Sequence, residues 1–451
     1  MLKHTVLAAA LAAAFGAPFS ARAAGDKELA QLREEIRQMK QDYEARIQAL
    51  ENRLQAAEAQ AVPTPAGQPP APAAGATANA NAFNPEMSLI LGGTYANLQQ
   101  DPRQFRIQGF VPGGEDIGPG ARSFNLGESE LTLRANIDPQ FAGQMTFALA
   151  ADNSVGVEEA FFRTRGLSNG LNLKGGRFLS AIGYLNSQHA HAWDFVDAPL
   201  AYQAFFGGQF RPDGVQLTWL APAERFVELG VEAGNGAAFP GSDRNKNGIG
   251  SSALFAHVGD DIGDSASWRL GASLLHTSAA QRSFDDGGVT SAFSGRSNTW
   301  IVDGIYKWAP NGNAAQTNFK LQGEYFRRRE TGTLDFASTS PAAVTDAYAS
   351  AQSGWYLQGV YQFRPLWRVG LRYDKLYSGT PDLGATLDRA SLPLLTSYNP
   401  SRSTVMLDYS PSEFSRLRLQ VARDKSRPGA SDNQIFLQYI MSLGAHGAHT
   451  F

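Results

Sequence analysis

Apolar and polar residues alternate along most of the chain beyond residue 85. The stretch 366–376, LWRVGLRYDKL, is typical, because apolar residues at every second position flank arginine, glycine or aspartate. The same pattern recurs at 131–137, 404–409 and 414–423. Successive side chains of a strand point to opposite faces, so a period of two predicts strands with one apolar and one charged face.

The lengths of the connections indicate which face points inward. We expect sixteen strands, at approximately 86–98, 123–137, 139–151, 155–165, 171–179, 213–221, 225–235, 250–259, 266–278, 297–308, 316–328, 353–364, 366–376, 402–410, 414–423 and 431–444. The links after strands 1, 5, 7, 9, 11 and 13 are long, whereas those after even-numbered strands are short turns such as Asp138-Pro139. A soluble sandwich would bury the apolar face, but long loops at one end and tight turns at the other are typical of a membrane barrel. The sequence therefore predicts an all-β transmembrane β-barrel of about 16 antiparallel strands, with its short turns and both chain ends on the periplasmic side.

The first 83 residues differ in character and divide into three segments. Residues 1–23 combine a positive start, a short apolar core and a small-residue cleavage pattern, which predicts a signal peptide. Residues 24–60 carry apolar residues at spacings of three and four, which predicts an N-terminal α-helical coiled coil; a single amphipathic helix is the alternative. The Pro/Ala-rich stretch 61–83 predicts an extended linker, and residues 84–451 are the barrel domain.

The composition and the absence of known catalytic motifs argue against several classes of function. The 451 residues contain no cysteine and carry a formal net charge of −3 at pH 7, so neither a disulfide scaffold nor a nucleic-acid partner is implied. The sequence holds no nucleophile elbow, no Walker loop and no H-E-x-x-H motif. We therefore expect no enzyme activity and assign no catalytic residue.

Several short motifs of the barrel segment resemble one group of outer-membrane proteins. They are "FNPEMSLILGGTY", "LGESELTLRANIDPQF", "VEEAFF", "GGRFLSAIGYLNSQHAHAWDF", "GVQLTWLAP" and the closing "LGAHGAHTF". The segment resembles the phosphate-selective porin O/P superfamily, and within it the branch labelled zinc-regulated outer-membrane proteins. This resemblance implies a sixteen-stranded, trimeric channel in the outer membrane of a Gram-negative bacterium. Some names of the branch mention TonB-dependent receptors, but about 370 barrel residues are too few for their 22 strands.

The stretch 188–195, QHAHAWDF, lies in the long third loop and holds the main candidate site. Because the corresponding loop of porins often folds into the lumen, we expect a constriction loop here by analogy of fold. His189 and His191 project to the same side of an extended chain, and Asp194 and Asp197 can complete a nitrogen–oxygen ligand set for zinc. The alternative is packing, in which aromatic residues such as Trp193 hold the loop against the wall and the histidines are hydrogen-bonded. Both interpretations remain open, and zinc is the one cofactor that the sequence suggests.

Charged residues on the polar faces of the strands are candidates to line the pore. They are Arg134, Lys320, Arg368, Arg372, Arg416, Arg418, Glu130, Glu324, Asp374 and Asp408. Four of the arginines fall on the thirteenth and fifteenth strands, and arginine ladders favour anions. Because carboxylates lie among these arginines, we expect only mild anion selectivity.

The remaining candidates have simpler explanations. His446 and His449, in the closing "GAHGAHTF", are expected to lie in a solvated tail, and His257 and His276 to be structural. The stretch 243–248, DRNKNG, opens like a calcium loop, but a leucine stands where such a loop needs its bidentate glutamate. We therefore expect a polar turn there.

These observations favour a channel for the passive diffusion of small hydrophilic solutes or ions, mildly anion-selective or linked to zinc or phosphate uptake. The alternative is a structural outer-membrane anchor whose periplasmic coiled coil spaces the barrel from the cell wall. The expected partners are outer-membrane lipid and lipopolysaccharide, and further copies of the chain in a homotrimer. The barrel-assembly machinery is expected as well, because the chain ends in an aromatic residue, Phe451, after an alternating strand.

Overall fold

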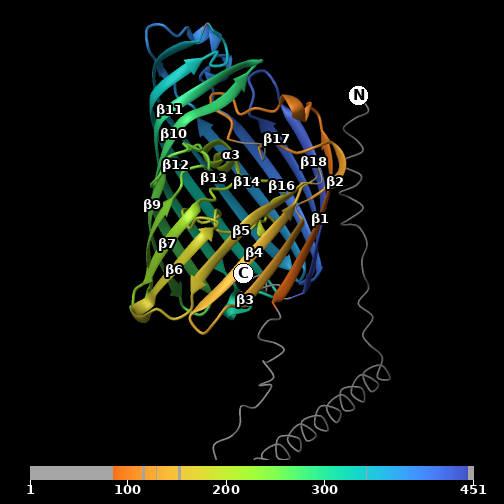
Figure 1. The fold of residues 1–451 in the computed structure, drawn as a ribbon. Coiled ribbons are helices and arrows are strands. Elements are labelled where there is room, and N and C mark those ends of the chain that lie inside the picture. The colour runs from red at the N-terminus through yellow and green to blue at the C-terminus, as the bar shows by residue number, and fades with distance from the viewer. Residues whose placement is uncertain (1–84, 114–116, 128, 151–153, 342, 445–451) are drawn as a thin grey trace, which may run out of the picture. The chain divides into compact units, whose positions relative to one another are not determined.

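The structure is a computed structural model, and it describes residues 85–113, 117–127, 129–150, 154–341 and 343–444 (Figure 1). The predicted signal peptide, coiled coil and linker lie outside the described residues, as do the two histidines and the phenylalanine of the C-terminal tail. Within the ranges given above, no helix is long and apolar enough to cross a membrane.

One continuous sheet of antiparallel strands dominates the fold. The strands are β1 (Glu86–Leu98), β2 (Ser123–Leu126), β3 (Ser129–Asn136), β4 (Phe141–Leu149), β5 (Val155–Thr164), β6 (Leu171–Arg177), β7 (Asp213–Leu220), β8 (Phe226–Gly234), β9 (Ser251–Ile262), β10 (Ala266–Asp286), β11 (Val289–Trp308), β12 (Asn318–Phe336), β13 (Val344–Arg364), β14 (Trp367–Tyr377), β15 (Asp382–Leu383), β16 (Ser401–Ser412), β17 (Ser415–Lys425) and β18 (Asp432–Gly444). The helices are α3 (Leu200–Phe206) and the 3-10 turns η1 (Pro102–Gln104), η2 (Ser168–Gly170), η3 (Ala190–Ala192), η4 (Pro310–Gly312), η5 (Arg389–Ser391) and η6 (Pro393–Leu395).

The sheet closes on itself into a barrel (Figure 1). β1 pairs with β18, from Ser88 opposite Gly444 to Leu98 opposite Gln434. β1 also pairs with both β2 and β3, so these two share one place in the ring, and β15 only adds two residues beside β13. The 18 strands of the sheet therefore fill sixteen places. The predicted barrel of about 16 antiparallel strands is confirmed.

The two faces of the wall differ as the alternation predicts. On β14, Leu371 is 61% exposed, whereas its neighbour Arg372 is 3% exposed. On β17, Val421 is exposed and the adjacent Gln420 is buried. Apolar side chains therefore cover the outside and polar side chains fill the inside, which is the polarity of a membrane barrel and the reverse of a soluble sandwich.

Short turns gather at the end of the barrel where β1 begins and β18 ends. Residues 365–366, for example, connect β13 to β14. The longer connections, 99–122, 178–212, 235–250 and 378–400, lie at the opposite end or enter the barrel from it. This division agrees with the predicted arrangement of turns and loops.

Two of the expected long loops are strands instead. β10 continues to Asp286 and β11 begins at Val289, so only Gly287 and Gly288 connect them. Both glycines have a positive φ, 64° and 88°, as a type I′ turn requires. Residues 337–343 likewise form a short connection between β12 and β13. The prediction of long links after the ninth and eleventh strands is wrong, because both segments extend the wall as hairpins.

Residues 178–212, between β6 and β7, fold into the barrel and are called the lumen loop below (Figure 1). The loop contains η3 and α3, and all seven residues of α3 are buried. α3 ends at Gly207, which has a φ of 67° and whose added Cβ would lie 1.6 Å from the carbonyl oxygen of Gly113. The end of the helix therefore requires glycine at this position.

The largest apolar cluster lies inside the barrel, between α3 and the inward faces of β9–β14. The rings of Tyr202, Phe205 and Phe206 lie around Phe326 of β12, with centroids 5.2, 5.6 and 5.8 Å away. Phe110, from the first long loop, meets the ring of Phe205 edge-on. The lumen loop is therefore packed against one side of the wall, and any open space must lie along the other.

Candidate functional site

Carboxylates of the wall hold the first half of the lumen loop by its backbone. Glu159, Glu232 and Glu324 lie on β5, β8 and β12 and are buried. They accept hydrogen bonds from the backbone N–H groups of Leu179, Ala181 and Leu185 at 2.9, 3.0 and 3.0 Å. A loop inside a barrel has no neighbouring strand to satisfy its N–H groups, so these carboxylates provide the acceptors.

Glu324 is shared by several donors. The hydroxyls of Tyr202 and Tyr356 donate to its carboxylate at 2.9 and 2.6 Å. Gly183 passes so close that an added Cβ would lie 2.3 Å from Oε2. Burial and the charge of Glu324 raise the pKa of Tyr202 well above its usual value, so the hydroxyl remains a donor. Glu324, predicted to line the pore, is therefore an anchor of the loop.

Asp194 fastens the second half of the loop to β12 and β14. Its carboxylate lies 2.5 Å from Nζ of Lys320 and 3.2 Å from the guanidinium of Arg368. The side-chain amide of Gln358 donates to the same carboxylate at 3.2 Å. Burial alone would raise the pKa of Asp194, but Lys320 and Arg368 outweigh that effect and lower the pKa below its usual value. The carboxylate is therefore ionised and held between two cations.

Asp197 fastens the loop to β14 and β16. Its carboxylate lies 2.7 Å from Arg372 and 2.6 Å from Arg402. Burial alone would raise the pKa of Asp197, but the two guanidinium groups outweigh that effect and lower the pKa to about 2. Asp374 lies 3.1 and 3.7 Å from the same arginines and accepts the backbone N–H of Leu200 at 2.9 Å. This second carboxylate fixes the start of α3.

Arg416 and Arg418 of β17 bind carbonyl groups of the loop. They donate to the backbone oxygen of Trp193 at 3.1 and 2.8 Å, and Arg418 also donates to Asp408 at 2.8 Å. Both arginines are buried, with exposed fractions of 9% and 1%. The arginines predicted to form a basic strip therefore face the loop and its carboxylates, not an open path.

The two histidines lie against an acidic part of the wall. η3 stacks the rings of His189 and His191, with centroids 5.5 Å apart. Nδ1 of His191 and Nδ1 of His189 lie 3.1 and 3.2 Å from the two oxygens of Glu130 on β3. His189 also lies 3.1 Å from Glu158, through Nδ1, and 3.1 Å from Glu159, through Nε2. Burial alone would lower the pKa of His189, but the three carboxylates outweigh that effect and raise it well above its usual value.

The predicted grouping of the histidines with Asp194 and Asp197 is wrong. Both aspartates are committed to the cations of β12, β14 and β16. The carboxylate beside both histidines belongs to Glu130, which precedes His191 by 61 residues. The loop thus meets basic residues of the wall on one side and acidic residues on the other.

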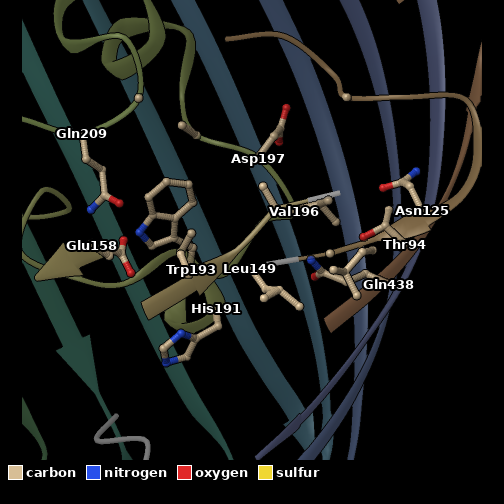
Figure 2. A pocket seen from close by; sticks show the side chains of 18 of the residues that line it. Thr94, Asn125, Leu149, Glu158, His191, Trp193, Val196, Asp197, Gln209 and Gln438 are labelled. Atoms are coloured by element: carbon tan, nitrogen blue, oxygen red, sulfur yellow. The ribbon is translucent and has the colours of Figure 1, made fainter. Parts of the chain in front are cut away.

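A cavity of about 480 Å³ lies beside the lumen loop, along β1, β2, β4, β5 and β18 (Figure 2). Glu158, His191 and Trp193 line it on one side, and Thr94 and Gln438 line it on the other. Further polar lining residues are Asn125, Ser154, Asp197, Gln203, Gln209 and Arg211. The polar side chains of this lining can hydrogen-bond to water and polar solutes.

The other predicted candidates lie apart from this cavity. Arg134 is exposed, and its pairing with the first residue of β1 places it near the end with the short turns. His257 is buried 2.9 Å from a glutamate of β8, and His276 is hydrogen-bonded at 2.9 Å to an asparagine of β11. Asp243 accepts a backbone hydrogen bond within its own turn at 2.9 Å, as expected for a polar turn.

No family model matches the chain. An uncharacterized protein of Aquifex aeolicus (strain VF5) is 30% identical to it in an alignment 405 positions long, which covers 82% of this chain and 80% of the relative. The chain belongs to the family of that Aquifex protein. Because this relative is itself uncharacterized, the function of the family has to be argued from the geometry of the barrel interior.

Solved structures similar to the chain include outer-membrane proteins. The loop-deletion mutant OmpTdeltaL8 of Vibrio cholerae has a TM-score of 0.49 and 13% identity, covering 80% of this chain and 99% of that chain. The outer membrane channel DcaP of Acinetobacter baumannii has a TM-score of 0.48 and 14% identity, covering 80% and 97%. The anion-selective porin from Comamonas acidovorans has a TM-score of 0.47 and 12% identity, covering 80% and 99%.

Asp197→Asn should loosen the lumen loop. The substitution removes the loop's charge from Arg372 and Arg402, and breaking a buried ion pair costs about 3–5 kcal/mol. We expect a lower free energy of unfolding in urea and faster cleavage of residues 178–212 by protease. Asp243→Asn, in an exposed turn, is the matched control and should change stability by less than about 0.5 kcal/mol. Equal effects of the two substitutions would show that Asp197 does not anchor the loop.

Proposed function

We propose that the chain is an outer-membrane channel through which small hydrophilic solutes or ions diffuse passively. The position of the cavity carries this proposal, because α3 of the loop packs onto β9–β14 and the cavity lies along β1, β2, β4, β5 and β18. The apolar outer face supports contact with lipid. A space of about 480 Å³ lies within the range of pockets that hold small molecules, which supports solutes of that size.

The charge along this path is mixed. Glu158, Asp197, His191 and Arg211 all contribute to the lining, so carboxylates and cations face the same space. Arg368, Arg372 and Arg418 attract mobile anions little, because aspartates of the wall and of the loop neutralise them. We therefore propose weak ion selectivity in place of the mild anion preference expected from the sequence. Phosphate uptake and membership of the phosphate-selective superfamily rest on the resemblance of the motifs.

We also place the protein, as a proposal, in the outer membrane of a Gram-negative bacterium as a homotrimer. Phe124 of β2 is 84% exposed, and its ring lies 4.9 Å from that of Tyr95 on β1. The exposed ring of Phe124 offers apolar area for contact between copies. The barrel-assembly machinery stays a predicted partner on the strength of the terminal aromatic residue.

The alternative function, a structural anchor, rests on the predicted coiled coil, which lies outside the described residues. Deleting residues 26–82 separates the two functions. A channel keeps its conductance after this deletion because the barrel and the lumen loop are intact, whereas an anchor loses envelope integrity in cells. Unchanged detergent sensitivity of cells that carry the deletion would remove the anchor hypothesis.

Narrowing the cavity should reduce conduction. Ala148 of β4 lines the cavity, so Ala148→Trp should lower single-channel conductance in planar bilayers by about two-fold or more. Ala135→Trp, on the exposed outer face of β3, is the matched control and should conduct like the unmodified protein. If the folded, unmodified protein shows no conductance steps, the channel proposal fails. If Ala148→Trp has no effect, the path does not run through this cavity.

A further inference from the structure

Glu130, His189 and His191 bring three metal-binding atoms together at the edge of the cavity. Among the described residues, one carboxylate oxygen and two imidazole nitrogens of this group all lie within 4.8 Å of one another. The two Nδ1 atoms lie 3.1 and 3.2 Å from the carboxylate oxygens. Tetrahedral zinc with bonds of about 2.0–2.1 Å separates neighbouring ligand atoms by roughly 3.3 Å. Both nitrogens therefore lie from the carboxylate at about the spacing that such an ion requires, and the three ligand atoms together lie within 4.8 Å of one another.

We infer that Glu130, His189 and His191 form a binding site for a divalent transition-metal cation of the zinc class. Two imidazoles and one carboxylate suit zinc and its neighbours better than calcium or magnesium, which prefer oxygen ligands alone. The ion would take the place of the direct contacts between the imidazole nitrogens and Glu130. Three protein ligands leave a fourth position open for water or a passing solute.

Glu159 supports this assignment because it contacts the ring of His189 through the nitrogen that does not face Glu130. It lies 3.1 Å from Nε2 of His189, on the opposite side of the ring from Nδ1. A carboxylate that accepts the N–H of a histidine fixes its tautomer and directs the other nitrogen to the metal. This relation between a carboxylate, a histidine and a metal recurs in zinc sites, and here the lumen loop and β5 create it.

The charges and the access route of the site are consistent with a cation. Three carboxylates, those of Glu130, Glu158 and Glu159, surround the histidines, and Arg211 lies 3.5 Å from Glu158. A divalent ion together with Arg211 balances these three negative charges while both imidazoles are neutral. His191 and Glu158 line the cavity, so an ion can enter from it (Figure 2).

Zinc binding can be measured directly, without reference to conduction. The folded full chain with His446→Ala and His449→Ala, which removes the tail histidines, is titrated with zinc chloride by calorimetry. We expect one site per chain. Affinity should fall at least ten-fold in His191→Ala and in Glu130→Gln, and about 10–100-fold in Glu159→Gln, because loss of a supporting carboxylate weakens metal sites by that factor. His276→Ala, distant from the site, is the control and should bind as the parent does.

Cobalt supplies a second readout that does not depend on the calorimetric background. Its visible absorption should show tetrahedral coordination in the parent and lose it in His191→Gln, which keeps a polar side chain where alanine would leave a gap. Variants are compared only when the lumen loop is as resistant to protease as in the parent. Zinc binding that survives the combined His189→Ala and His191→Ala change would overturn the site. Absence of binding in the parent would also overturn it, and would leave the channel proposal untouched.

Three exposed arginines lie close together on the outer face of the wall. Arg296 on β11 and Arg327 and Arg329 on β12 are exposed, while the alternating residues Arg328 and Glu330 are each 1% exposed. In the part of the chain that the structure describes, none of the three exposed arginines forms an ion pair. Unpaired like charges on neighbouring strands repel each other, so this patch favours an external anion.

The surroundings of the patch indicate where that anion lies. Arg327 is paired across the strands with Trp300, and the next outward residue on its own strand is Tyr325. Both aromatic side chains are about two-fifths exposed, at 41% and 42%. Exposed tryptophan and tyrosine on a barrel mark the boundary between hydrocarbon and headgroups. The arginines follow this boundary towards the end with the long loops, at the level of the headgroups.

We propose that Arg296, Arg327 and Arg329 bind the phosphate groups of lipopolysaccharide in the outer leaflet. Arginine forms bidentate hydrogen bonds with phosphate, and three guanidinium groups match a headgroup with more than one phosphate. The in-register neighbours of the arginines, among them Asn298, Thr331 and Ser353, are neutral, so no carboxylate on these positions competes for the guanidinium groups.

Native mass spectrometry of the folded full chain with purified lipopolysaccharide tests this surface. Changing Arg296, Arg327 and Arg329 to Gln should reduce the bound fraction at least about five-fold, since the variant loses three charge-assisted contacts to phosphate. The control changes Arg163, Arg165 and Arg364 to Gln, the same loss of charge at the end with the short turns. Equal losses in both variants would show only unspecific attraction by charge. Unchanged binding in the first variant would overturn the assignment.

Discussion

A chain segment inside a barrel carries backbone N–H and C=O groups that must form hydrogen bonds. The arrangement of charged side chains inside this barrel depends on how these groups are bonded. The lumen loop has no neighbouring strand to bond with, so charged side chains of the wall form hydrogen bonds with its backbone groups. Glutamates on β5, β8 and β12 accept its N–H groups, and arginines on β16 and β17 donate to its carbonyls. In return, Asp194 and Asp197 of the loop form ion pairs with Lys320 and Arg402 of the wall. Buried charges are tolerated here because each has a partner of opposite sign or a hydrogen bond.

This arrangement also makes the interior asymmetric. The aromatic residues of α3 need an apolar surface, and only β9–β14 offer inward phenylalanine, tyrosine and leucine in sufficient number. Packing α3 there leaves polar residues of β1 and β18 facing space on the other side. The cavity and the acidic contacts of the two histidines are therefore consequences of the same packing that fixes the helix. A candidate path and a candidate metal site lie side by side because one loop shapes both.

The sequence predicted the wall far better than its interior contacts. A period of two identifies strands and assigns Arg372 or Gln420 to the inner face from local spacing alone. It does not predict a bulge, and the register shift beside Thr146 is what allows the adjacent Glu158 and Glu159 both to reach His189. It also gives no signal for which carboxylate meets a histidine, because Glu130 comes from a strand 61 residues away from His191. The hairpins of β10–β13 were missed because, beyond the lipid, the outward positions of their strands carry polar residues such as Ser283 and Asp285 instead of the apolar residues that the pattern requires.

The long sequence separation of the loop's anchors has a consequence for assembly. Several contacts that hold its second half join residues far apart in the sequence, 174 positions for Asp194 and Arg368 and 225 positions for Trp193 and Arg418. Contacts of such separation form only after the intervening chain is ordered, since closing a long loop costs entropy before it is rewarded. The lumen loop precedes β16 and β17 by about 190 residues in the sequence. Its partners on these two strands are therefore among the last parts of the chain to be synthesised. The anchors of the loop on β16 and β17 therefore form only once these last strands are in place, so the second half of the loop reaches its final position late in folding.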